Sequence, residues 1–181
     1  MKNRFFRSAA LAAVLVGLSA SLGAAGLAIP DGEAAKPVPG AKELPDPNLT
    51  YKVVFDLAAA APKIDEVNPG LETVARYVNT LAKYGVPPDH RKIAVVFHRA
   101  ATEAILNNQT FKERNQGRDN PNIALIREMK KAGVDFRVCG QAVLAHKIDP
   151  KTIQPEIELD LWALTTIVNM EMRGYAHIAG E

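Results

Sequence analysis

The stretch NPNIALIREMKKAGVDFRVCGQAV, residues 120–143, contains the features that decide the fold. Asn120 is a residue type that caps helices, and Pro121 is favoured at the first helical position. Two lysines suit the last turn of such a helix, and Gly133 is typical of the residue that ends one. An apolar run follows and stops at the only cysteine in the chain. The stretch therefore predicts a helix from Asn120 to Gly133 that leads into a buried strand ending at Cys139.

The same alternation of strand and helix continues on both sides of this stretch. YKVVFDLA (51–58) and KIAVVFH (92–98) are apolar and β-branched, which predicts two buried strands, and NPGLETVARYVNTLAKYG (68–85) has a helical apolar period with Asn68 as its cap. This alternation predicts a single α/β domain with a mostly parallel sheet of about five strands and helices on both faces. The remaining elements that we expect are a short helix (99–108), a polar loop (109–119), a strand (157–163), a helix (164–174) and a last strand (175–178).

The N-terminal region predicts an exported protein. Residues 1–28 combine three basic residues, an alanine-rich apolar run and a small-residue site that ends at Ala28, which is the pattern of a signal peptide. A retained membrane anchor is the alternative, but the apolar run is weakly hydrophobic for a true span. We expect a periplasmic or secreted protein with a proline-rich linker or disordered arm at 29–49, a folded domain at 50–181, and no membrane contact after cleavage.

Charge gives no indication of a nucleic-acid partner. The whole chain has 22 basic and 20 acidic residues, and the three charged residues of the leader are all basic. The chain that remains after cleavage is nearly neutral, whereas nucleic-acid binding usually requires a basic surface.

Three polar side chains are predicted to meet at one edge of the sheet. Asp56, His98 and Cys139 stand at or near the ends of three predicted strands. In parallel sheets, binding sites form beyond the carboxyl ends of the strands. A thiol becomes a nucleophile only as the thiolate, and a helix that starts after Gly140, near Gln141, would stabilise that anion. The alternative is that Cys139 is a small apolar residue of the core.

Several familiar chemistries are excluded by the sequence. A dithiol redox motif needs a second cysteine, and a serine hydrolase needs a serine, but residues 29–181 contain one cysteine and no serine. The four histidines stand in four separate segments, so we expect no metal site. We expect no cofactor. An unpaired cysteine in an exported protein is usually a reactive thiol or is bonded to another chain, and both alternatives stay open.

The runs IAVVFHRAATEAILNN, NPNIALIREMKKAGVDFRVCGQAV and EMRGYAHI resemble the DsrE/DsrF family of sulfur-trafficking proteins. The resemblance covers nearly all of residues 51–181. It implies a parallel-sheet subunit that assembles as trimers or hexamers, and an active cysteine that carries a persulfide and hands its sulfur onward.

The family pattern maps onto individual positions of this chain. Cys139 matches the persulfide cysteine, His98 matches a histidine that could tune the thiolate, and Asn120 and Asn122 match the Asn-Pro-Asn motif. Arg99 departs from the pattern, because the family commonly has glycine there. With the residues named above, the candidate pocket comprises Asp56, Arg99, Asn120, Asn122, Gly140 and Gln141 around Cys139 and His98.

Two functions follow as hypotheses. The first is an exported sulfur carrier or sulfurtransferase that works with a sulfur donor or acceptor protein, or with a small sulfur species. The second is a non-catalytic oligomeric module that binds a small ligand and in which Cys139 is incidental. The segment IELDLWALTTIVNMEM also predicts a homotrimer or hexamer, because its predicted helix is apolar on more than one face.

Overall fold

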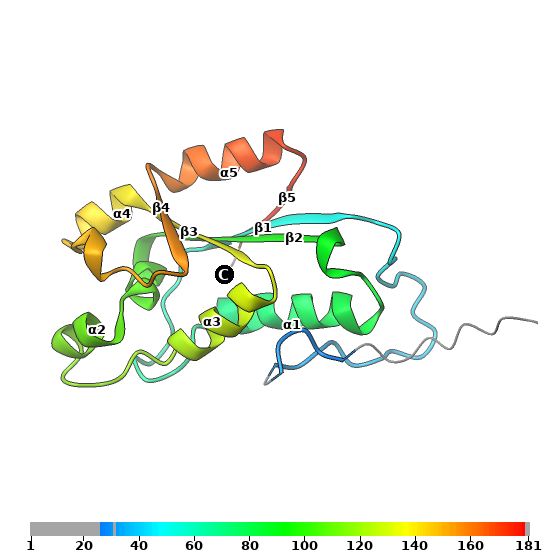
Figure 1. Ribbon diagram of the computed structural model, residues 1–181, viewed down its shortest axis with the longest axis horizontal. Helices are drawn as coiled ribbons and strands as arrows, with labels where there is room; N and C mark the ends of the chain where they lie inside the picture. The colour runs from blue at the N-terminus through cyan, green and yellow to red at the C-terminus, as the bar shows by residue number, and fades with distance from the viewer. Residues whose placement is uncertain (1–25, 31, 180–181) are drawn as a thin grey trace, which may run out of the picture.

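The computed structural model describes residues 26–30 and 32–179 and shows one five-stranded sheet with helices on both faces (Figure 1). All paired strands are parallel, and their order across the sheet is β4-β3-β2-β1-β5. The predicted α/β class and the parallel sheet are therefore confirmed. The strands are β1 (Tyr51–Leu57), β2 (Arg91–Phe97), β3 (Asp135–Cys139), β4 (Ile157–Asp160) and β5 (Ala176–Ala179).

The helices divide into two layers. In Figure 1, α1 (Pro69–Lys83) and α3 (Ile123–Lys131) lie below the sheet, while α4 (Gly140–Ala145) and α5 (Ala163–Met172) lie above it. The short helix α2 (Asn108–Arg114) lies at one end of the molecule. Short 3-10 helices complete the chain at Pro88–His90, Arg99–Ile105 and Pro150–Thr152.

The two faces of the sheet are packed very differently. The face covered by α1 and α3 holds the large core, in which Phe97 stacks on Phe136 with ring centroids 6.0 Å apart. Each fully buried side chain of this size contributes about 1.5–3 kcal/mol of hydrophobic stabilisation. The opposite face holds a smaller cluster, formed by Val54, Ala94, Val96, Cys139, Ala142, Ala163, Ile167 and Met170. The large core, which we call the thick core layer, therefore supplies most of the hydrophobic burial. Cys139 belongs to the smaller cluster on the opposite face, which we call the thin core layer.

Two local predictions are wrong. The segment 109–119 is not a loop throughout, because α2 occupies much of it, with Phe111 buried and Asn107 accepting a hydrogen bond from the Thr110 amide. Asn120 is not the cap of α3, which begins only at Ile123. The amide groups of this asparagine are instead engaged in a buried network described below.

The described residues of the proline-rich segment, 29–30 and 32–49, form no helix or strand, but part of the segment packs on α1. The backbone N–H of Ile29 donates to Asn79 Oδ1 at 2.8 Å, and Asn79 Nδ2 donates to the Ile29 carbonyl at 3.0 Å. Both residues are buried. Further along, the Ala35 amide donates to Thr80 Oγ1. Ile29 and Ala35 are therefore attached to α1.

Most of the predicted leader, residues 1–25, lies outside the described residues. Within the ranges 26–30 and 32–179, none of the helices has the length and apolar character needed to cross a bilayer.

The helix α5 has two apolar faces. Ile167 and Met170 are buried against the sheet, as a helix covering this face requires. Leu161, Leu164 and Val168 remain exposed in the single chain. This exposed side of α5 is the surface on which the predicted assembly depends.

Candidate functional site

An open cleft of about 510 Å³ lies at the carboxyl ends of three neighbouring strands. Asp56 of β1, His98 after β2 and Cys139 of β3 all line it. They meet because parallel strands in adjacent register end at the same edge of the sheet. Arg99 and Gln141 complete its polar wall. The other lining residues come from α4, α5 and the turns beside them: Ala142, Ala145, His146, Trp162, Ala163, Leu164 and Ile167.

Cys139 stands at the junction between β3 and α4. Its side chain packs in the thin core layer, and 4% of the residue is exposed. It is the only cysteine in the chain, so it has no partner for an internal disulfide. The helix α4 has six residues, so its dipole can stabilise a thiolate only weakly. A reagent must enter the cleft to reach the sulfur.

Gly140 is required by a close approach between two strand ends. A Cβ atom at this position would lie 2.7 Å from the Asp160 carbonyl oxygen and 3.1 Å from that of Leu161. Both atoms belong to the backbone at the end of β4, which pairs with β3 through Cys139 and Asp160. The glycine is thus needed for space and not for a left-handed turn, and it fixes the position of the cysteine beside β4.

His98 is held by both its backbone and its side chain. Its amide donates to the Leu57 carbonyl at 3.0 Å, and its Nε2 is in direct contact with Asp56 Oδ1. Asp56 Oδ2 lies 3.5 Å from His177 Nε2, and His177 Nδ1 lies 3.2 Å from Glu171 Oε1. The carboxylate of Asp56 therefore orients the His98 ring, and a second histidine, which the sequence did not single out, approaches the same carboxylate.

The sequence contains little that could have identified His177. It lies on β5, which is last in the chain but pairs with β1, so that His177 stands opposite Val54. Side chains alternate along a strand, which places Val54 and Asp56 on the same face. The pairing of the last strand with the first is the missing information.

Arg99 lines the cleft in an unusual backbone conformation. Its φ is +49°, which lies in the left-handed region that side chains other than glycine rarely adopt. Its side chain makes no ion pair or hydrogen bond with any residue in the described part of the chain. Its charge is therefore available to a molecule in the cleft.

Arg137, on the same face of the sheet as Cys139, is in the opposite situation. Its guanidinium lies 3.0 Å from Asp135, 2.9 Å from Glu158 and 3.5 Å from Asp160. The hydrogen bond to Asp135 is the main cause that raises the pKa of Arg137 above its ordinary value. These three carboxylates neutralise its charge, so Arg99 is the arginine that can act on an anion at Cys139.

Three of the predicted pocket residues, Gly140, Asn120 and Asn122, do not line the cleft. Asn120 Nδ2 donates to the carbonyls of Ala104 and Leu106 at 3.0 and 2.7 Å, and its Oδ1 accepts from the backbone and side-chain amides of Asn122. Asn122 Oδ1 in turn accepts from the Asn68 amide. Both asparagines are buried, and their network ties the 3-10 helix that follows His98 to α1 and α3.

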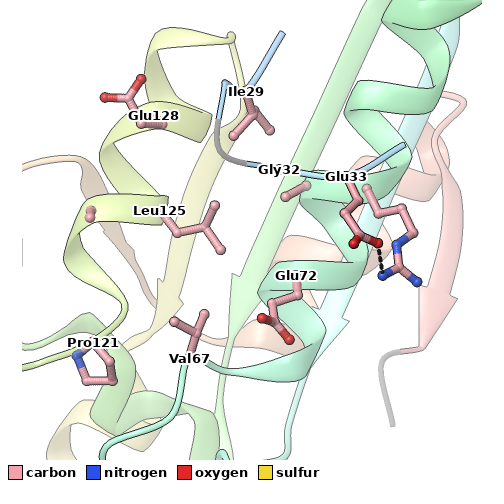
Figure 2. A pocket seen from close by; sticks show the side chains of 11 residues that line it. Ile29, Gly32, Glu33, Val67, Glu72, Pro121, Leu125 and Glu128 are labelled. Atoms are coloured by element: carbon pink, nitrogen blue, oxygen red, sulfur yellow. Dashed lines mark hydrogen bonds and ion pairs between the residues drawn. The ribbon is translucent and has the colours of Figure 1, made fainter. Parts of the chain in front are cut away.

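A second cavity, of about 490 Å³, lies between α1, α3 and the N-terminal segment (Figure 2). Figure 2 shows Leu125 and Val67 pointing toward the space between the two helices. Glu33, Glu72 and Glu128 line it, and the only cation in its wall, Arg76, pairs with Glu33 at 2.9 Å. It contains no cysteine or histidine. We therefore place the candidate site at the Cys139 cleft and not here.

No metal-ligating group of three or more His, Cys, Asp or Glu side chains occurs within residues 26–30 and 32–179. The side chains that line the cleft include a thiol, a histidine oriented by a carboxylate, and a guanidinium without a partner among the described residues.

Comparisons with known proteins agree with the fold. A protein of unknown function from Methanobacterium thermoautotrophicum has a similar structure, with a TM-score of 0.50 and 18% sequence identity over 72% of this chain and 99% of that chain. A search of curated proteins gives no match. The family model described as the DsrE/DsrF-like family matches residues 45–179. Because this match spans most of the sequence, the protein belongs to the DsrE/DsrF-like family and has its sulfur-relay type of fold.

Proposed function

We propose that this protein is an exported sulfur carrier, or sulfurtransferase, that accepts sulfur as a persulfide on Cys139 and hands it to a partner. The observation that carries the proposal is the position of the only cysteine at the end of β3, in a cleft shared with His98 and its carboxylate Asp56. Membership of a family with a sulfur-relay fold supports the same chemistry.

The proposed reaction has two balanced steps. The Cys139 thiolate attacks the sulfane sulfur of a donor, a new sulfur–sulfur bond forms, and the donor group leaves with the electron pair of the bond that breaks. A thiolate of the acceptor then attacks the outer sulfur of the persulfide, and Cys139 leaves as the thiolate. His98 supports both steps when it stabilises the sulfur anion, and Asp56 holds its ring in place.

The burial of Cys139 suits a carrier that works outside the cytoplasm. Exported proteins meet an oxidising environment, in which exposed thiols and persulfides react with other thiols and with oxidants. With 4% of the residue exposed, the sulfur is screened from such encounters except through the cleft. The basic and apolar leader is the sequence feature that supports export.

An assembly of identical subunits is part of the proposal. Leu164 and Val168 of α5, together with Leu161 in the turn before it, expose apolar surface, and Leu164 also belongs to the cleft wall. Contiguous exposed apolar surface of this kind usually marks an interaction site. A homotrimer, or a hexamer of two trimers, would cover it.

The burial of Cys139 also favours a second candidate, a non-catalytic module that binds a small ligand in the cleft. In that case the cysteine is one of several small residues in the thin core layer. The two candidates differ in the reactivity of the thiol, because a carrier must let a sulfur donor reach it and a packing residue need not.

Intact-mass measurement after incubation with a sulfide-derived polysulfide distinguishes the two candidates. The carrier predicts adducts in steps of one sulfur atom on the mature protein, and their loss in Cys139→Ser. His98→Ala should slow the loading without abolishing it, because the histidine stabilises the anion but does not hold the sulfur. Circular dichroism of each variant checks that the fold is retained. A wild-type protein that gains no sulfur would leave the binding module as the better account.

A further inference from the structure

Arg99 is the feature of the cleft that its local structure does not explain. Residues other than glycine have positive φ at three places in the described chain, and two of these, Gln116 and Lys147, follow the ends of helices α2 and α4. A left-handed residue is common at a helix end, where it redirects the chain. Arg99 instead is the first residue of the 3-10 helix that follows β2 and ends no helix. Glycine would adopt its backbone conformation at lower cost.

The side chain of Arg99 is also free of partners. It is exposed at the cleft wall, and no carboxylate of the described residues pairs with it. The other charged and titratable groups of the wall are engaged: Asp56 with His98 and His177, and His146 at 3.9 Å from Glu103. Among the described residues, Arg99 is therefore an unpaired cation in the same cleft as the candidate nucleophile.

We propose that Arg99 makes this site selective for an anionic sulfur donor, a small oxyanion with a sulfane sulfur, of which thiosulfate is the simplest. The inference rests on the carrier function proposed above and names the class of its donor. A planar guanidinium binds two oxygens of a sulfonate group at once, as it does those of carboxylates and phosphates. Such a contact directs the sulfane sulfur of the donor toward the cleft.

The chemistry of this donor creates a need for the cation. Attack of the Cys139 thiolate on thiosulfate brings two anions together, forms the bond between Cys139 Sγ and the sulfane sulfur, and releases sulfite with the electron pair of the old bond. The charges balance, and no oxidant or reductant is required. A guanidinium beside the approaching anions offsets their repulsion. An uncharged reagent would gain nothing from it.

The test uses two alkylating reagents of nearly the same shape and different charge. The ratio of the rates at which iodoacetate, an anion, and iodoacetamide, which is neutral, modify Cys139 reports the charge selectivity of the cleft. We expect Arg99→Gly to lower this ratio roughly 5- to 10-fold, the factor for loss of one charge contact near solvent. The matched control is Lys147→Gly, which also replaces an exposed cation at positive φ but lies outside the cleft, and which should leave the ratio unchanged.

Loading from thiosulfate, followed by intact mass, completes the test. The wild type should load, Arg99→Gly should load more slowly by at least the same factor, and added salt should slow the wild type more than the variant. An Arg99→Gly protein with the wild-type alkylation ratio, or with wild-type loading, overturns the inference and leaves the carrier function standing. A wild type that loads neither from thiosulfate nor from polysulfide overturns both.

Discussion

Replacement of Gly140 by alanine tests whether the contact between β3, α4 and β4 positions the cysteine. The added Cβ would lie 2.7 Å from the Asp160 carbonyl oxygen, whereas ordinary contacts begin at 3.4 Å. The strand ends must therefore separate by about 0.7 Å, and the obstructing atoms are backbone atoms that cannot rotate away. Overpacking of this kind costs about 1–3 kcal/mol of the free energy of unfolding.

The assay is urea unfolding of Gly140→Ala, followed by circular dichroism, with thermal unfolding as a second measure. In a chain of this size each kcal/mol lowers Tm by about 2–4 °C, so a fall of several degrees is expected. Iodoacetamide should also modify Cys139 faster, since separation of β4 from β3 opens the pocket beside the sulfur.

The control is Leu144→Ala, four residues further along α4 on an exposed position outside the cleft. It should change the free energy of unfolding by less than about 0.5 kcal/mol, as exposed substitutions usually do. A Gly140→Ala protein as stable as this control, with an unchanged rate of thiol modification, would refute the account of how Cys139 is positioned.

Three further predictions concern the arm, the asparagine network and assembly. Asn79→Ala removes the side-chain partner of the buried amide and carbonyl of Ile29, so the free energy of unfolding should fall by about 1–3 kcal/mol. Limited proteolysis of this variant should cut near Ile29 first, and unchanged protection there would contradict the role of Asn79 in holding Ile29. Asn120→Ala removes one of two donors from each of two buried carbonyls, which keep Gln154, and leaves the Asn122 amides without their acceptor, so it should lower the free energy of unfolding by about 1–3 kcal/mol; an unchanged urea midpoint would argue against the network. Leu161→Glu, in the exposed turn before α5, should convert a trimer or hexamer into monomers by light scattering, and a monomeric wild type would contradict the assembly.

The parts of the fold that the sequence predicted well are those with local causes. Asn68 accepts a hydrogen bond from the Gly70 amide at 2.9 Å and caps α1, which starts at Pro69 as expected. The central strands β1 and β2 were predicted within one residue at each end, because they are buried on both faces and their apolar runs are unbroken.

The errors arose where distant contacts outweigh local preference. Asn120 has the residue type of a cap, but its side chain donates to the buried carbonyls of Ala104 and Leu106, which also accept from Gln154, and the helix starts three residues later. The polar segment before it forms α2 because Phe111 reaches the core from an otherwise hydrophilic run. Neither contact has a signal in the neighbouring residues.

The candidate site was predictable only in part for the same reason. Asp56, His98 and Cys139 could be placed at one edge because each ends a strand of a parallel sheet. The approach of His177 to Asp56 depends on the pairing of β5 with β1. The Arg99 guanidinium is unpaired because no carboxylate among the described residues lies within ion-pair distance of it. These are properties of the assembled structure and not of any one segment.

The central claim is that Cys139 accepts sulfur and passes it on, and a single-turnover transfer tests it most directly. Protein loaded with sulfur is freed of donor by gel filtration and mixed with excess cysteine, and both products are alkylated and weighed by mass spectrometry. The account predicts that each sulfur atom lost from Cys139 appears as cysteine persulfide, and that Cys139→Ser carries none to transfer. Sulfur retained by the protein, or a mixed disulfide between Cys139 and cysteine with release of sulfide, would contradict it.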